Sequence, residues 1–412
     1  MHMRKLGVGL VAAAAMTMAS APAVSKVEGN TIYLGSAISL TGRYSTNGIH
    51  TQNGYELAAQ LINDAGGVEV GGESYQIEIV YYDDESTPAR GAQLAERLIS
   101  QDGIQFMLGP YSSGLTKAIA PVTEQHGVPM VEAEGASRSL FTQGYRYLFA
   151  VLSTSEQYLA SAIALAAAQA EAEGRDPSEL TVALAFENDP FSQDVRAGVM
   201  EDAASFGMQI VIDDSLPADL SDMTPTLIKV QAVQPDLLII SGHSKGATTA
   251  ARQIGEMGIS VPMIAMTHCD AAKITENFPA ASEGILCATQ WSPTLTYSDE
   301  LFGSAQDFSD LFQATYEGYE AGVPYQAAQA AAAVMVFADA FERAQSFDQD
   351  AVRDALSATD MMTFYGGIRF SEAGNNIAKP MVLWQIQDNQ YQVVAPPEWA
   401  SHELVYPRVA GE

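Results

Sequence analysis

The segment Gly109-Pro110-Tyr111-Ser112-Ser113-Gly114 follows the apolar run Phe106-Met107-Leu108 and leads into a helix-like stretch from Leu115 to Gln125. A second turn, Gly135-Ala136-Ser137, follows the apolar run Pro129-Met130-Val131. Apolar strands that run through such turns into helices are typical of parallel sheets, which bind ligands at the carboxyl ends of their strands. A helix N-terminus at that edge favours an anionic group. The two strand ends therefore predict a crevice that holds a small acid.

The same order of strand and helix repeats along most of the chain. One series begins at Ile32 and a second begins near Ser155, so the sequence predicts two Rossmann-like lobes with parallel sheets covered on both faces. After the strand that ends at Thr289 helices dominate, and we expect this late block to pack on the first lobe. The first helix is expected from Asn53 to Ala65, and the late helices from Glu300 to Tyr319, Ala327 to Ala344 and Asp350 to Ala358.

The chain begins with the features of a secretory signal, which predicts an exported protein. Arg4 and Lys5 precede an apolar run that is too short to span a bilayer, and small residues follow. Residues 1–25 are therefore predicted to be a signal peptide, with cleavage between Ala19 and Lys26. The Ala-rich run from Ala327 to Ala340 is interrupted by polar residues, which predicts a buried helix. The formal net charge of −30 argues against nucleic acid or an anionic membrane as a partner.

The two cysteines leave one question open. Cys269 follows one predicted strand and Cys287 lies in the next, so a disulfide is conceivable in an oxidising compartment, but the sequence does not decide it. His243, His268, Cys269 and Asp270 lack the close spacing of a zinc site, so no metal site is expected. No G-x-G-x-x-G follows the first strand, so no dinucleotide cofactor is expected either.

Short motifs occur in a fixed order along the chain: Ser39-Leu40-Thr41-Gly42, Asn63-Asp64-Ala65-Gly66-Gly67, Tyr82-Asp83-Asp84, the turns at 109–114 and 135–137, and Asp189-Pro190-Phe191. In this order and spacing they resemble the type I periplasmic solute-binding proteins of ATP-driven importers. The resemblance is to the leucine/isoleucine/valine-binding and amide/urea-binding branch, and it covers essentially the whole mature chain.

The resemblance implies two lobes joined by three hinge crossings, with a ligand that closes the lobes around itself. The crossings fall near Leu152-Ser153, Gln290-Trp291 and Lys379-Pro380. Lobe 1 would then comprise residues 26–153 and 291–379, and lobe 2 would comprise residues 154–290 and 380–412.

The resemblance also implies which residues hold the ligand. Ser113 and Ser137, with the backbone at Ala136 and the neighbouring Ser112, would bind a carboxylate. Thr267 stands where branched-chain amino acid binders place a glutamate for the ligand's ammonium, so Asp270 or Glu134 would have to replace that charge, or the ligand lacks an ammonium. The remaining expected ligand contacts are Phe191, His243, His268, Trp291 and Tyr44.

The function that follows is a periplasmic receptor, not an enzyme, that delivers a small carboxylate-bearing solute, such as an amino acid or related organic acid, to an inner-membrane ABC permease. We expect it to act as a monomer, and the identity of its solute stays open. One alternative is a soluble ligand-sensing domain of a signalling system. Another is a serine esterase, because Gly242-His243-Ser244-Lys245-Gly246 matches the G-x-S-x-G pattern with Ser244 as nucleophile.

Overall fold

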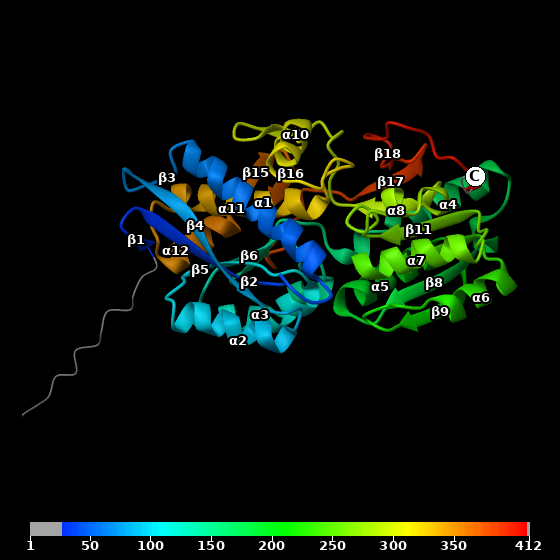
Figure 1. Ribbon diagram of the computed structural model, residues 1–412, viewed down its shortest axis with the longest axis horizontal. Coiled ribbons are helices and arrows are strands. Elements are labelled where there is room, and N and C mark those ends of the chain that lie inside the picture. Colours follow the sequence, from blue (N-terminus) through cyan, green and yellow to red (C-terminus); the bar gives the residue numbers. More distant parts are fainter. Residues whose placement is uncertain (1–26, 410–412) are drawn as a thin grey trace, which may run out of the picture.

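The computed structural model describes residues 27–409 and contains two seven-stranded sheets side by side (Figure 1). The predicted signal peptide, residues 1–25, lies outside the described residues. We call the first sheet with the helices packed on it lobe 1, and the second sheet with its helices lobe 2. The predicted pair of lobes with parallel sheets is confirmed.

Lobe 1 is built on a sheet with the strand order β3-β4-β2-β5-β6-β7, and β1 pairs with β2. The pairs from β4 through β7 are parallel, whereas β3 and β1 join as antiparallel strands. The central strands are almost wholly buried and apolar, as expected for a sheet covered on both faces. The strands are β1 (Val27–Glu28), β2 (Thr31–Ile38), β3 (Val68–Val70), β4 (Glu73–Asp83), β5 (Phe106–Leu108), β6 (Met130–Glu132) and β7 (Leu148–Ala150).

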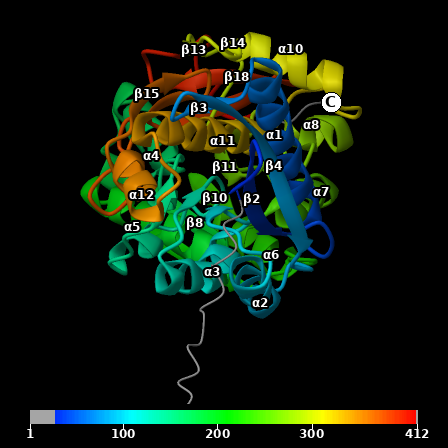
Figure 2. The same ribbon diagram turned by 90° about the vertical axis from the view of Figure 1, so that its left-hand side faces the viewer.

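Helices cover both faces of this sheet, with α1 and α11 on one side and α2 and α3 on the other (Figure 2). The Ala-rich helix α11 is buried along most of its length, which confirms the predicted buried helix. Among residues 27–409 no helix has both the length and the hydrophobicity needed to cross a membrane. The helices on this side of the molecule are α1 (Ser45–Asp64), α2 (Pro88–Ser100), α3 (Ser113–His126), α10 (Ala305–Thr315), α11 (Tyr325–Ala344) and α12 (Gln349–Ser357).

Lobe 2 repeats the pattern with the strand order β18-β17-β12-β11-β10-β8-β9. Strands β8 to β12 are parallel, and the late strands β17 and β18 add to the sheet in antiparallel orientation. The strands are β8 (Thr181–Glu187), β9 (Gln209–Leu216), β10 (Leu237–Ser241), β11 (Met263–Thr267), β12 (Leu286–Thr289), β17 (Val382–Gln387) and β18 (Gln390–Ala395). The helices are α4 (Ala160–Ala172), α5 (Pro190–Ser205), α6 (Thr224–Val233), α7 (Ser244–Glu256), α8 (Ile274–Asn277) and α9 (Pro279–Ser282).

The order of elements makes the chain pass three times between the lobes. It leaves lobe 1 after β7, returns after β12 and reaches lobe 2 again at β17. The segment between β12 and β17 packs on lobe 1, as predicted; for example, the Tyr316 hydroxyl donates to the carbonyl of Asn53 in α1 at 3.1 Å. It also contains two small hairpins, β13 (Ser298–Asp299) with β14 (Gly303–Ser304) and β15 (Asp360–Thr363) with β16 (Gly366–Arg369).

Two predicted helix boundaries are wrong. Helix α1 begins at Ser45, two turns before the predicted Asn53. The prediction missed these turns because they are polar and show no helical spacing of apolar residues. The helix predicted from Glu300 to Tyr319 is shorter, because Ser304 and Asp307 form a capping box that starts α10 at Ala305. Strand β18 was not predicted.

The contact between α1 and α11 is so close that it requires a glycine. A Cβ atom on Gly54 would lie 2.2 Å from the carbonyl oxygen of Ala327, a backbone atom that cannot move independently. Gly91 in α2 is different, since its Cβ would meet only the side-chain ends of Ile119 and Leu115, at 3.2 Å.

We therefore expect Gly54→Ala to lower the free energy of unfolding by about 1–3 kcal/mol, the usual cost of overpacking a core. Gly91→Ala is the matched control. Its gain in helix propensity of about 1 kcal/mol should offset the milder crowding. Urea denaturation of both variants measures the difference, and equal stabilities would contradict the account.

Candidate functional site

The carboxyl ends of the central strands of both lobes face each other across a small cavity. Loops after β5 and β6 reach it from lobe 1, and loops after β8, β10 and β11 reach it from lobe 2. The lining is aromatic and polar, with five hydroxyl-bearing side chains and with two imidazoles from lobe 2. Its residues are Tyr111, Ser112, Ser113, Glu134, Tyr158, Phe191, His243, His268 and Tyr325.

Ser112 and Ser113 stand at the N-terminus of α3, where the first backbone N–H groups have no partner within the helix. Neither serine hydroxyl caps the helix. The Ser113 Oγ accepts from the backbone N–H of Ser137 at 3.1 Å, so its proton remains available to donate. The Ser112 Oγ is buried and makes no hydrogen bond. This end of the cavity therefore offers hydroxyl donors and a positive helix end, which suit an anion.

Tyr111 joins the two lobes directly above this end. Its hydroxyl lies 2.6 Å from Nδ1 of His243 and 2.9 Å from Nε2 of His268. Burial lowers the pKa of His243, but the carboxylates of Asp189 and Glu187 together outweigh this effect, so that the net pKa is raised. Burial and the neighbouring His243 lower the pKa of His268 to about 3. A positive charge is thus favoured on the imidazole of His243 and disfavoured on that of His268.

Glu134 lies at another part of the cavity wall. Its carboxylate accepts from the Thr51 hydroxyl at 2.9 Å and from the Gln329 amide at 2.7 Å. Burial raises the pKa of Glu134 well above its usual range. Asp270 does not line this cavity. Its Oδ2 accepts from the backbone N–H of Tyr325 at 3.2 Å.

The structure brings Ser112, Ser113, Phe191, His243 and His268 to the cavity, as the sequence predicted. Tyr44 lies just outside the lining, with its ring edge against Tyr111 and His243 at centroid distances of 5.5 and 4.7 Å. The resemblance to solute-binding proteins did not assign Tyr111, Tyr158 or Tyr325 to the site. Tyr111 lies inside the motif that predicted the site, whereas no local pattern marks the other two.

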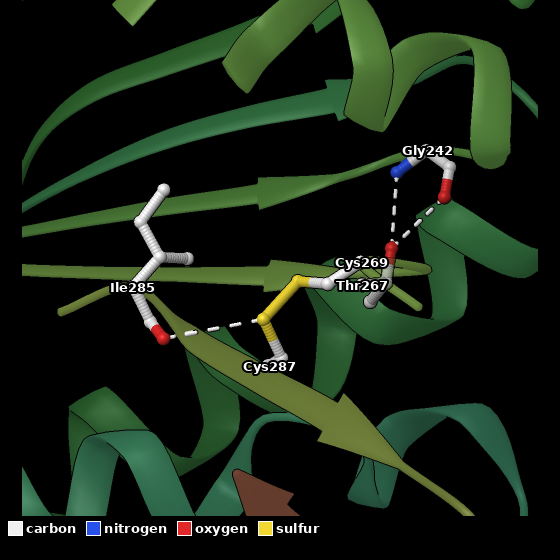
Figure 3. Close-up of a disulfide and its surroundings, with 5 residues drawn as sticks. All are labelled: Gly242, Thr267, Cys269, Ile285 and Cys287. Carbon is white, nitrogen blue, oxygen red and sulfur yellow. Dashed lines mark hydrogen bonds between the residues drawn. A yellow bond between two sulfur atoms is a disulfide. The ribbon is translucent and has the colours of Figure 1, made fainter. Parts of the chain in front are cut away.

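Four other residues that were predicted to contact the ligand do not line the cavity: Ala136, Ser137, Thr267 and Trp291. The Ser137 hydroxyl donates to Asp194 of α5, and the N–H and C=O of Ala136 are both bonded to backbone, to Glu134 and Ser155. The Thr267 hydroxyl is bonded to both backbone groups of Gly242 (Figure 3).

Trp291 is fully buried among Phe308 and Phe364, and its indole N–H donates to the carbonyl of Phe364 at 3.1 Å.

Ser244, the nucleophile of the esterase alternative, serves a different contact. Its hydroxyl donates to Oδ1 of Asn47 in α1 at 2.6 Å, which links α7 of lobe 2 to lobe 1. His243 instead contacts Tyr111 and Asp189. Ser244 therefore makes a contact between the lobes, and His243 does not act as a general base for it, as a serine esterase would require.

A disulfide joins Cys269 and Cys287, with a Cα–Cα distance of 5.9 Å, and this settles the pairing that the sequence left open (Figure 3). It ties the loop after β11 to β12. His268, the residue before Cys269, has a left-handed backbone with φ of 61°, which costs free energy for a residue other than glycine. The covalent link at the next residue stabilises this turn and the position of the imidazole.

Replacing both cysteines by serine should lower the free energy of unfolding by about 3 kcal/mol, because the crosslink closes a loop of 18 residues. Urea denaturation of the oxidised wild type and the double variant measures this. An unchanged midpoint would show that the disulfide does not hold this loop.

The three chain crossings meet in one buried hydrogen-bond network. The Ser153 hydroxyl donates to the carbonyl of Lys379 at 2.6 Å, and the Gln290 amide donates to the carbonyl of Ser153 at 2.9 Å. The Lys379 ammonium donates to the carbonyl of Gln290 and lies 4.4 Å from the centre of the Tyr365 ring. Tyr365 in turn donates to Gln329, the partner of Glu134, at 3.2 Å. A continuous chain of contacts thus connects the crossings to the cavity.

Lys379 makes this network sensitive to pH. Burial lowers the pKa of Lys379 from 10.5 to about 7. Between these two values the unfolded chain binds a proton that the folded protein does not, so the contribution of Lys379 to stability rises with pH.

We expect the free energy of unfolding of the wild type to rise relative to that of Lys379→Met between pH 7 and pH 10, by at most about 1.4 kcal/mol per pH unit. Urea denaturation at several pH values measures it. Lys117→Met, at an exposed lysine, is the control and should run parallel to the wild type. If the free energies of unfolding of Lys379→Met and the wild type also ran parallel with pH, the result would contradict the deprotonation of Lys379 in the folded protein.

The sequence is similar to those of known proteins along most of its length. The family model described as "Periplasmic binding protein" matches residues 31–390. The leucine-, isoleucine-, valine-, threonine-, and alanine-binding protein of Pseudomonas aeruginosa is 24% identical over 366 residues, which cover 88% of this chain and 91% of the relative.

Two solved structures share the fold. The branched-chain amino acid transporter substrate binding protein LivJ from Streptococcus pneumoniae, in complex with isoleucine, has a TM-score of 0.75 and 22% identity, covering 92% of this chain and 100% of that chain. An ABC transporter solute binding protein from R. palustris, in complex with benzoate, has a TM-score of 0.74 and 18% identity, covering 93% and 98%.

Proposed function

The chain belongs to the periplasmic binding protein family, a family of binding proteins and not of enzymes, and from this premise we propose that it is the solute receptor of an ABC importer. Its solute is a small organic acid that binds in the cavity between the lobes. The mature protein works in the periplasm as a monomer and delivers the solute to an inner-membrane permease.

One observation carries the choice of an acid. Two serines at the N-terminus of α3 meet the cavity, and one of their hydroxyls, on Ser112, is buried without a hydrogen-bond partner. A buried hydroxyl without a partner is costly, and a carboxylate would satisfy it together with the helix N-terminus. Isoleucine and benzoate, the ligands of the two structural neighbours, have only the carboxylate group in common.

The second group of the solute distinguishes an amino acid from a simple acid. An amino acid would place its ammonium on Glu134, because Glu134 lines the cavity and Asp270 does not. An acid without an ammonium leaves Glu134 protonated, as its raised pKa favours. The aromatic rings of Phe191, Tyr158 and Tyr325 provide an apolar surface for either side chain.

We propose that the lobes close on the solute by rotation at the three crossings, with lobe 1 formed by residues 26–153 and 291–379 and lobe 2 by residues 154–290 and 380–412. Two exposed contacts outside the cavity lining join these parts in the structure, and opening of the lobes would break them. The Arg138 guanidinium makes two hydrogen bonds to Glu201 of α5, at 2.9 and 3.1 Å. The Arg43 guanidinium donates to the carbonyl of Ala218 at 3.0 Å.

Calorimetry with leucine, benzoate and their amides tests the recognition of a carboxylate. A hydrogen bond to a charged group contributes about 1.5–3 kcal/mol, so Ser113→Ala should weaken binding of the acid by about 10- to 100-fold. The amide should bind the wild type more weakly than the acid by a similar factor, and Ser113→Ala should narrow that gap.

Ser260→Ala, at an exposed serine of lobe 2, is the control and should leave both affinities unchanged. Equal affinity of the wild type for an acid and its amide would eliminate carboxylate recognition and favour an amide or urea as the solute.

A further inference from the structure

Three side chains capable of binding a metal meet beside the solute cavity. Glu187 ends β8, Asp189 is the N-cap residue of α5, and His243 follows β10, which lies next to β8 in the sheet. Within residues 27–409 they form the one group of three whose ligand atoms, one from each residue, all lie within 4.8 Å of one another. Neighbouring strand ends hold them, so their positions do not depend on a mobile loop.

All three are buried, with exposed fractions of 2% for Glu187, 8% for Asp189 and 4% for His243. Asp189 uses Oδ1 to cap α5, accepting from the backbone N–H of Phe191 at 2.9 Å and of Ser192 at 3.2 Å. Its other oxygen, Oδ2, makes no hydrogen bond. Nε2 of His243 makes none either and has only an ion-pair contact with Asp189. Buried polar atoms without such partners are rare and call for an occupant.

The distance between Nε2 of His243 and the capping oxygen of Asp189 suits one small cation. Nε2 of His243 lies 3.3 Å from Oδ1 of Asp189. Two ligands on a tetrahedral ion with bonds of about 2.0–2.1 Å lie about 3.3–3.4 Å apart. On the other side of the ring, Nδ1 lies 2.6 Å from the Tyr111 hydroxyl, the kind of outer contact that fixes the tautomer of a metal-binding histidine.

Two glycines leave the space that the carboxylate of Glu187, the third ligand, occupies. A Cβ atom on Gly246 would lie 2.1 Å from Oε1 of Glu187, and one on Gly242 would lie 2.5 Å from it. The carboxylate therefore occupies space that any larger residue at either position would fill. With a neutral imidazole and both carboxyl groups ionised, the three ligands carry a negative charge that a divalent ion balances.

We propose that Glu187, Asp189 and His243 form a binding site for one divalent transition-metal ion of the Zn²⁺ type. Imidazole with two carboxylates suits Zn²⁺, whereas Ca²⁺ and Mg²⁺ prefer oxygen ligands alone. Three protein ligands leave a coordination position open for water. The ion would use Nε2 of His243, and the solute cavity meets the same ring near Tyr111, so both can be occupied together.

Zn²⁺ itself is the probe. The full-length mature protein is treated with a chelator and dialysed, then titrated with Zn²⁺ by calorimetry, with metal content measured after gel filtration. We expect one Zn²⁺ per chain and a higher melting temperature with Zn²⁺ than without. Glu187→Gln and Asp189→Asn should each weaken binding by about 100-fold or more. Asparagine caps a helix as well as aspartate, so the Asp189 variant should keep its fold.

The control is His126→Asn, which removes an exposed histidine that lies 2.9 Å from Glu96. It should bind one Zn²⁺ with unchanged affinity. Three results would overturn the proposal: no binding to the wild type, binding that survives in both Glu187→Gln and Asp189→Asn, or binding lost in His126→Asn. The last would assign the ion to the surface pair.

Discussion

The structure depends on one constraint: the carboxyl ends of two parallel sheets must face each other, although the chain crosses between the two lobes three times. Ser153, Gln290 and Lys379, one from each crossing, meet this constraint by bonding to one another in a buried network. Because backbone carbonyls accept all three of those bonds, a rotation at the crossings changes the network as a whole. The contacts through Tyr365 and Gln329 to Glu134 extend this dependence to the cavity.

The chemistry of the cavity follows from where strands end. Strand ends in a parallel sheet are followed by helix N-termini, so α3 of lobe 1 and α5 and α7 of lobe 2 all begin beside the cavity. Their positive ends favour anions. Asp189 caps α5 from within the chain, whereas α3 has no side-chain cap, which leaves its N-terminus open to the carboxylate of the proposed solute.

Local patterns allowed the sequence to predict the parts of the fold and site that lie close together in the chain. The turn with Ser112 and Ser113 and the strand-helix alternation both have such patterns. Tyr158 and Tyr325 reach the cavity only through the topology, which no local pattern reports. Trp291 and Thr267 were expected near the ligand from the family resemblance, but their polar groups are satisfied inside the protein, by Phe364 and Gly242. Glu187 gave no signal, because its metal-binding partner His243 is 56 residues away in the chain.

The most direct test of the account is a crystal structure of the protein grown with the acid that binds most tightly in calorimetry. The account predicts that the solute lies between the lobes, with a carboxylate oxygen about 2.6–3.0 Å from Oγ of Ser113 and close to the N-terminus of α3. A solute bound outside this cavity, or one whose carboxylate points away from Ser112 and Ser113, would contradict it.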